Sequence, residues 1–121
     1  SDDILTNVRL ALNGAGDLDV AGNITADGEV TASNFKLSSD IRLKENIQSV
    51  QDKRIDDVQL IQFNFKGSDQ LRYGVSAQQL QKNYPEMVSE GKDGYLNVAY
   101  TDFLLAKVAR LEQRIKELER N

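Results

Sequence analysis

Ser39 and Lys44 are the residues with which this sequence could carry out nucleophilic chemistry. The chain contains no histidine and no cysteine, which excludes Ser-His-Asp and Cys-His catalysis and also histidine- or thiolate-ligated metal sites. Without histidine, a serine hydroxyl needs a lysine of lowered pKa, or a carboxylate, as its base at neutral pH. The stretch SSDIRLKEN, residues 38–46, offers both kinds of base beside two serines.

The spacing of five residues between Ser39 and Lys44 does not form a catalytic pair on a regular element. On an α-helix the two side chains would point about 140° apart, and on a strand they would be roughly 16 Å apart. Either a tight turn brings them together, or Lys44 of one subunit serves Ser39 of another. The purely structural alternative is that the serines and Asp40 cap a helix and the charges that follow are solvated.

The composition allows one modest domain with a smaller piece attached. The chain has 121 residues and a net charge of −4, and residues 1–40 carry seven carboxylates against two basic side chains. This charge gives no electrostatic reason to expect nucleic acid as a partner. No stretch is apolar enough to span a membrane, and no phosphate loop, cofactor motif or metal-ligand cluster is present. We therefore expect no cofactor, no metal and no membrane partner.

A six-residue repeat marks the first part of the chain. GNITAD (22–27) and GEVTAS (28–33) match at glycine, a branched residue, threonine and alanine, and GDLDVA (16–21) fits more loosely. Short β pieces separated by glycine every six residues favour a β-solenoid or an interwound β-shaft. Because so few apolar side chains cannot close a core alone, such a segment must stack on other copies. The alternative is a pair of surface hairpins.

The middle of the chain predicts a small α+β domain. VQLIQFNFKG (58–67) and LRYGVSA (71–77) read as two strands that are joined by a turn. AQQLQKNYPEM (77–87) predicts a short helix that stops before Pro85, and EGKDGYLNVAY (90–100) predicts a hairpin. The predicted fold class is therefore α+β, with a β-shaft before the domain and a long helix after it.

The last segment, residues 101–121, predicts a helix with Thr101 as its N-cap. Its apolar side chains alternate at spacings of four and three, the a/d pattern of a coiled coil. Opposite charges flank this seam, so Lys107 would pair with Glu112, and Arg114 with Glu119, of a neighbouring helix. The alternative is that the seam packs on the core of its own domain. The seam residues are Leu104, Val108, Leu111, Ile115 and Leu118.

The number of helices in this coiled coil is not fixed by the seam alone. Branched residues at a with leucine at d nominally favour two strands. Two heptads are also too short to hold an oligomer together by themselves. A β-shaft woven from three chains would override the two-strand preference, so we expect a trimeric coiled coil.

SSDIRLKENI resembles the Ser-Asp-x-Arg-x-Lys-x-x-Ile signature of the C-terminal intramolecular chaperone domain of phage tailspikes and tail fibres. That domain occurs in endosialidase tailspikes and L-shaped tail fibres, and a related autoprocessing domain occurs in myelin regulatory factor. YGVSAQQL (73–80), YPEMV (84–88), DGYLNVAY (93–100) and the terminal helix resemble later parts of the family. The resemblance covers about residues 38–121, and residues 1–38 are similar to the end of a triple-β-helix-like fibre shaft.

The resemblance implies a self-cleaving serine endopeptidase that acts once. The domain, residues 39–121, would form a homotrimer, register the fibre shaft upstream in the same chain, and then release it. Ser39 would be the nucleophile that attacks the carbonyl of Ser38, with Lys44 as general base. Asp40, Arg42 and Asn46 would shape the turn or stabilise the oxyanion. The implied location is the virion tail fibre, with assembly in the host cytoplasm.

Two other functions remain compatible with these residues to different degrees. A trimerisation cap that never cleaves would share every feature above and would stay in the fibre. A self-cleaving module of a eukaryotic transcription factor is disfavoured, because the repeat is acidic and no basic region is present. The fate of the bond between Ser38 and Ser39 separates the first two functions.

Overall fold

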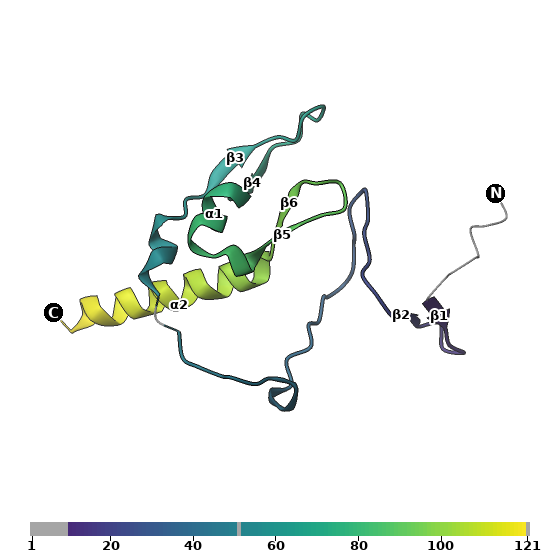
Figure 1. Cartoon of the computed structure of the whole chain (residues 1–121), viewed down its shortest axis with the longest axis horizontal. Coiled ribbons are helices and arrows are strands. Elements are labelled where there is room, and N and C mark those ends of the chain that lie inside the picture. The colour runs from purple at the N-terminus through teal and green to yellow at the C-terminus, as the bar shows by residue number, and fades with distance from the viewer. Residues whose placement is uncertain (1–9, 51, 121) are drawn as a thin grey trace. The chain divides into compact units, whose positions relative to one another are not determined.

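The computed structural model describes residues 10–50 and 52–120 of the chain. Over these residues the protein has two α-helices and three two-stranded antiparallel sheets (Figure 1), which confirms the predicted α+β class. The chain divides into two compact units, Ser1–Lys44 and Glu45–Asn121. The predicted functional boundary after residue 38, the three-chain shaft and the coiled coil stay predictions, because each depends on cleavage or on neighbouring chains.

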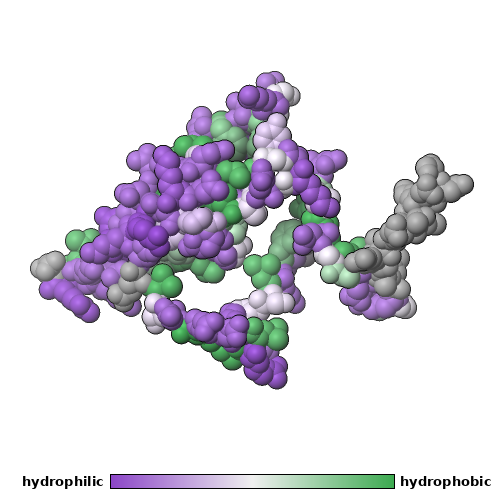
Figure 2. Space-filling view, in the orientation of Figure 1, coloured by the Kyte–Doolittle hydropathy of each residue, from purple (hydrophilic) through white to green (hydrophobic). Residues whose placement is uncertain are grey.

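The first unit contains one short hairpin and a long unpaired segment. β1 (Leu10–Leu12) pairs with β2 (Leu18–Val20) in antiparallel register. Residues 21–40 include the two close copies of the six-residue repeat and form no strand, so neither the predicted short β pieces nor the alternative pair of hairpins is present there in the single chain. Apolar side chains along this extended segment lie on the surface (Figure 2). They are Ile24, Val30, Phe35 and Leu37.

Two further hairpins form in the second unit, where the sequence predicts strands. β3 (Ile61–Phe63) pairs with β4 (Arg72–Gly74). β5 (Val88–Glu90) pairs with β6 (Leu96–Val98). Gly94, with φ of +85°, forms the tight turn between β5 and β6, a conformation that glycine adopts without steric cost.

The shorter helix, α1 (Ala77–Asn83), lies where the sequence predicts it. Ser76 caps its first turn by accepting a hydrogen bond from the Gln79 amide at 3.2 Å. The helix ends before Pro85, which disfavours helical backbone at the residue preceding it. The 3-10 helix η4 (Pro85–Met87) then leads into β5.

The long helix, α2 (Tyr100–Glu119), begins one residue before the predicted Thr101. Its N-cap is Ala99, which gives no side-chain cap, so the prediction of Thr101 as N-cap is wrong. The Ala99 amide donates to the Met87 carbonyl at 2.8 Å, and the Ala99 carbonyl accepts from the Phe103 amide at 3.1 Å. Backbone pairing between the chain segments around β5 and β6 therefore continues directly into the helix and fixes its start.

A small core holds the second unit together. Ile55 in the 3-10 helix η3 (Lys53–Asp57) and Leu80 in α1 are fully buried, and the core continues along one face of α2. The other elements of this unit gather along one side of α2 (Figure 1). Apolar side chains elsewhere on α2, among the described residues, are exposed. The other buried core residues are Val58, Val75, Tyr84 and Phe103.

Gly74 in β4 is required by the approach of Tyr100. A Cβ at residue 74 would overlap the Tyr100 hydroxyl and would lie 3.3 Å from Phe63 Cε1. That hydroxyl cannot move freely, because it accepts a hydrogen bond from the Val75 amide at 3.0 Å. We expect Gly74→Ala to reduce the free energy of unfolding by about 1–3 kcal/mol through overpacking. Urea denaturation at fixed protein concentration measures this loss.

A matched substitution separates this clash from a general effect of replacing glycine. A Cβ at residue 14 would meet open space, with no atom beyond its chain neighbours within 4 Å, so Gly14→Ala is expected to leave the unfolding midpoint unchanged. Adding Tyr100→Phe to Gly74→Ala removes the overlapping hydroxyl and should recover part of the loss. Equal stability of the two alanine variants would contradict the steric role of Tyr100.

Candidate functional site

A short turn brings Ser39 and Lys44 into contact within one chain. Lys44 Nζ donates a hydrogen bond to Ser39 Oγ at 2.9 Å. The chain between them forms the 3-10 helix η2 (Ile41–Leu43), in which the Leu43 amide donates to the Asp40 carbonyl at 3.0 Å. Of the two arrangements that the sequence left open, this geometry corresponds to the tight turn. The catalytic roles of Ser39 and Lys44 stay predictions.

Asp40 and Arg42 stabilise this turn by hydrogen bonds to each other. Asp40 is the N-cap of η2, and its Oδ1 accepts from the Arg42 amide at 2.9 Å. The Arg42 guanidinium also holds the same carboxylate, with Nη2 at 2.7 Å from Oδ2. These hydrogen bonds, first from the Arg42 side chain and then from its amide, lower the pKa of Asp40.

Asn46 has a different role from that of Asp40 and Arg42. Its φ is +55°, and it is the one described residue other than glycine with positive φ. Asparagine adopts this left-handed conformation more readily than most residues. No described hydrogen bond joins its side chain to Ser39 or Lys44, so Asn46 redirects the chain just after the turn.

The arrangement can support acyl transfer only under one condition. In the observed hydrogen bond the lysine is the donor, whereas a general base must accept the serine proton. Burial or nearby cations favour the neutral amine that can do so. Ser39 and Lys44 are both exposed in the single chain. The turn therefore supplies the proximity of the two groups that this reaction requires.

The predicted oligomerisation seam lies on an exposed side of α2. Its five side chains, from Leu104 to Leu118, are between 45% and 72% exposed. The face that packs on the domain uses other residues, with Phe103 buried and Ala106 half-buried against the core. The alternative that the seam packs on its own domain is therefore wrong for the single chain. A solvent-exposed apolar stripe of this length is typical of a surface that binds another protein.

The charged residues beside the seam have partners that the sequence did not predict. Lys107 Nζ donates to the carbonyls of Ile55 and Val58 at 3.0 and 3.2 Å. The Arg110 guanidinium binds the Asp56 carboxylate with Nη2 at 3.0 Å from Oδ2. Lys107 therefore ties α2 to the end of η3 in its own chain, whereas the sequence predicted that it pairs with Glu112 of a neighbour.

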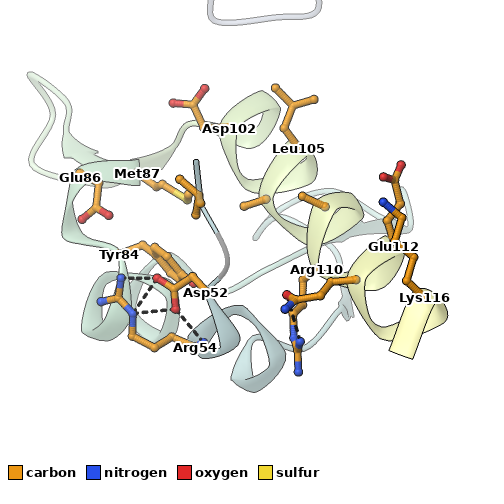
Figure 3. A pocket seen from close by; sticks show the side chains of 14 residues that line it. Asp52, Arg54, Tyr84, Glu86, Met87, Asp102, Leu105, Arg110, Glu112 and Lys116 are labelled. Atoms are coloured by element: carbon orange, nitrogen blue, oxygen red, sulfur yellow. Dashed lines mark hydrogen bonds and ion pairs between the residues drawn. The ribbon is translucent and has the colours of Figure 1, made fainter. Parts of the chain in front are cut away.

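A groove of about 680 Å³ lies beside α2 in the second unit (Figure 3). Asp52 and Arg54 are joined by hydrogen bonds next to Tyr84, and Arg54 lies 4.7 Å from the centre of the Tyr84 ring. The hydrogen bonds from Arg54 lower the pKa of Asp52 to about 2, and burial raises the pKa of Tyr84. Ser39 and Lys44 do not line this groove, which sequence reasoning did not find.

The part of the chain that the structure describes contains neither a metal-binding cluster nor a membrane-spanning helix. Within residues 10–50 and 52–120, no group of three acidic side chains could hold a metal ion. In the same residues no helix combines the length and hydropathy that a membrane crossing needs.

Comparison with known proteins identifies the domain that contains the turn. Residues 39–89 match the model of a family whose description is chaperone of endosialidase, and whose name classes it with the serine peptidases. The match starts at Ser39, includes η2 and η3, and ends in β5, so α2 lies beyond it. No curated protein matches the chain. Residues 39–89 of this chain are therefore similar to the endosialidase chaperone family.

Proposed function

We propose that this chain is an intramolecular chaperone that trimerises, registers a phage tail-fibre or tailspike shaft, and then cuts itself between Ser38 and Ser39. One observation carries the proposal: the family match begins at Ser39, whose Oγ lies 2.9 Å from Lys44 Nζ. The cut would fall where the unpaired segment 21–40 meets the matched domain. The protein would act in the virion tail fibre, after assembly in the host cytoplasm.

The proposed reaction is an acyl shift followed by hydrolysis. Ser39 Oγ attacks the carbonyl carbon of Ser38, while neutral Lys44 takes the hydroxyl proton. The C–N bond of the peptide breaks, the proton passes to the departing Ser39 amine, and an ester joins the two residues. Water then hydrolyses the ester and regenerates the Ser39 hydroxyl. The products are residues 1–38, with a new carboxylate, and residues 39–121, with a new amino terminus.

Trimerisation would supply both the register of the shaft and the condition for the reaction. The bare seam of α2 would pack around a three-fold axis, with the domains on the outside. The exposed repeat residues of segment 21–40 would find partners in the other two chains. Burial of the η2 turn among three chains would favour the neutral form of Lys44. Cleavage would then follow assembly, and the released shaft would be kinetically trapped.

A permanent trimerisation cap is the second candidate function. The exposure of both Ser39 and Lys44 in the single chain favours it, because a solvated amine is a poor base at neutral pH. In this case the turn would serve the fold only, and the domain would remain attached to the fibre.

Intact mass of the purified chain over time at neutral pH tests the proposal, with Ser39→Ala as the matched variant. We expect the chain to yield two fragments, residues 1–38 and 39–121, and the variant to stay whole. Hydroxylamine should convert the ester into a hydroxamate on residue 38, which mass spectrometry detects. A single uncut mass that persists in a trimer would contradict cleavage and favour the permanent cap.

A further inference from the structure

The chain contains two turns of the same construction, twelve residues apart. Each begins with an aspartate that caps a 3-10 helix and is followed two residues later by an arginine. In the first turn, Asp40 Oδ1 accepts from the amide and from Nε of Arg42 at 2.9 and 3.0 Å. In the second, Asp52 Oδ1 accepts from the amide and from Nε of Arg54, both at 3.0 Å. The aspartate therefore serves as cap and as anchor for the guanidinium in both.

The two turns differ in what else holds them. The second is fixed to its domain, because Arg54 Nη1 donates to the Asn83 carbonyl at 2.7 Å and its guanidinium covers the Tyr84 ring. Ile55 in the same turn is fully buried. In the first turn the three residues of η2 are exposed, and the described hydrogen bonds of the Arg42 side chain all go to Asp40. The first turn therefore depends on its own cap and clamp.

The ends of the first turn are the two residues of the proposed reaction. Ser39 directly precedes the cap, and Lys44 directly follows η2. If the turn opened to extended chain, Ser39 and Lys44 would lie roughly 16 Å apart. The distance of 2.9 Å between Oγ and Nζ exists only while the turn is closed.

We propose that Asp40 and Arg42 are positioning residues, which keep the η2 turn closed and so hold Lys44 on Ser39. This inference rests on the proposed self-cleavage for its kinetic consequence. It assigns no oxyanion contact to Arg42, because Nε and Nη2 of its guanidinium are already committed to Asp40. The two residues act in distinct ways, with Asp40 as cap and anchor and Arg42 as clamp.

The expected effects follow from which hydrogen bonds each substitution removes. Arg42→Ala removes the clamp and keeps the cap, so cleavage should slow about two- to fivefold. Asp40→Ala removes both, so cleavage should slow about tenfold or more. Asp40→Asn retains a cap oxygen and should lie between them. Arg42→Lys restores a cation without the two-pronged geometry and should recover part of the rate.

The second turn provides the matched controls. Arg54→Ala corresponds to Arg42→Ala, and Asp52→Ala corresponds to Asp40→Ala, in a turn that does not contain the reacting residues. These variants should lower the melting temperature of the domain and leave the cleavage rate unchanged well below that temperature. The Asp40 and Arg42 variants should leave the melting temperature of the domain unchanged and should lower the cleavage rate. Cleavage rates of the Asp40 and Arg42 variants equal to that of the parent chain would overturn the inference while leaving self-cleavage intact.

A second measurement decides the inference even if the parent chain is never cut. In the Ser39→Ala chain, which cannot cleave, the Lys44 ε-methylene should show a nuclear Overhauser effect to the methyl group at position 39. Addition of Arg42→Ala or Asp40→Ala should weaken this effect, and Arg54→Ala should not. An effect of unchanged strength in the Asp40 and Arg42 variants would overturn the positioning role. A weakened effect together with an uncut parent chain would support positioning and reject only the proposed function.

Discussion

Replacing Lys44 by alanine is expected to slow cleavage of the Ser38–Ser39 bond by at least about 100-fold. Removal of a general base costs typically 10²- to 10⁴-fold in rate. The chain contains no histidine that could substitute for the lysine, and the nearby Asp40 carboxylate is held by Arg42. The time course of intact mass measures the effect directly.

Two further variants distinguish a role of Lys44 as general base from a role as a positive charge. Lys44→Arg keeps a positive charge and a hydrogen-bond donor but cannot become a neutral base in a protein. We expect it to be as slow as Lys44→Ala. Lys53 is an exposed lysine in η3 and serves as control, since Lys53→Ala should cleave at the rate of the parent chain. Cleavage of Lys44→Arg at the parent rate would show that the lysine only positions or stabilises charge.

Replacing Leu111 by aspartate is expected to turn the proposed trimer into a monomer. Leu111 is the central residue of the seam, is 45% exposed in the single chain, and would be buried on assembly. Burial of one such side chain contributes about 1.5–3 kcal/mol per chain. The variant would also bring three carboxylates together at the axis, where desolvation and repulsion oppose assembly. Light scattering in the Ser39→Ala background measures the mass without interference from cleavage.

The same substitution in the cleavable chain tests the link between assembly and chemistry. If burial in the trimer produces the neutral form of Lys44, Leu111→Asp should also abolish cleavage. Leu60 is 72% exposed but lies outside α2, so Leu60→Asp is the matched control and should leave mass and cleavage unchanged. A dimer in the parent chain would contradict the three-chain assembly and would agree with the a/d preference of the seam alone. Cleavage by a monomeric variant would disconnect the reaction from assembly.

Much of the second unit was predictable because its signals are local. Alternation of apolar residues located β3 and β4, and Pro85 located the end of α1. The periodicity of the last segment predicted α2 and identified its apolar seam. The start of α2 was predicted wrongly, because the Met87 carbonyl, which is distant in sequence, binds the Ala99 amide.

The sequence alone determined which residues are available for chemistry: it supplies Ser39 and Lys44 and excludes histidine and cysteine. It could not determine the distance between them, because residues five positions apart do not meet on a helix or a strand, and the closed turn brings them together. Tertiary contacts also decided which side of α2 faces its own domain, since Lys107 binds the carbonyls of Ile55 and Val58 and Phe103 packs in the core. Such contacts join residues about fifty positions apart, and no local pattern of residue types encodes them.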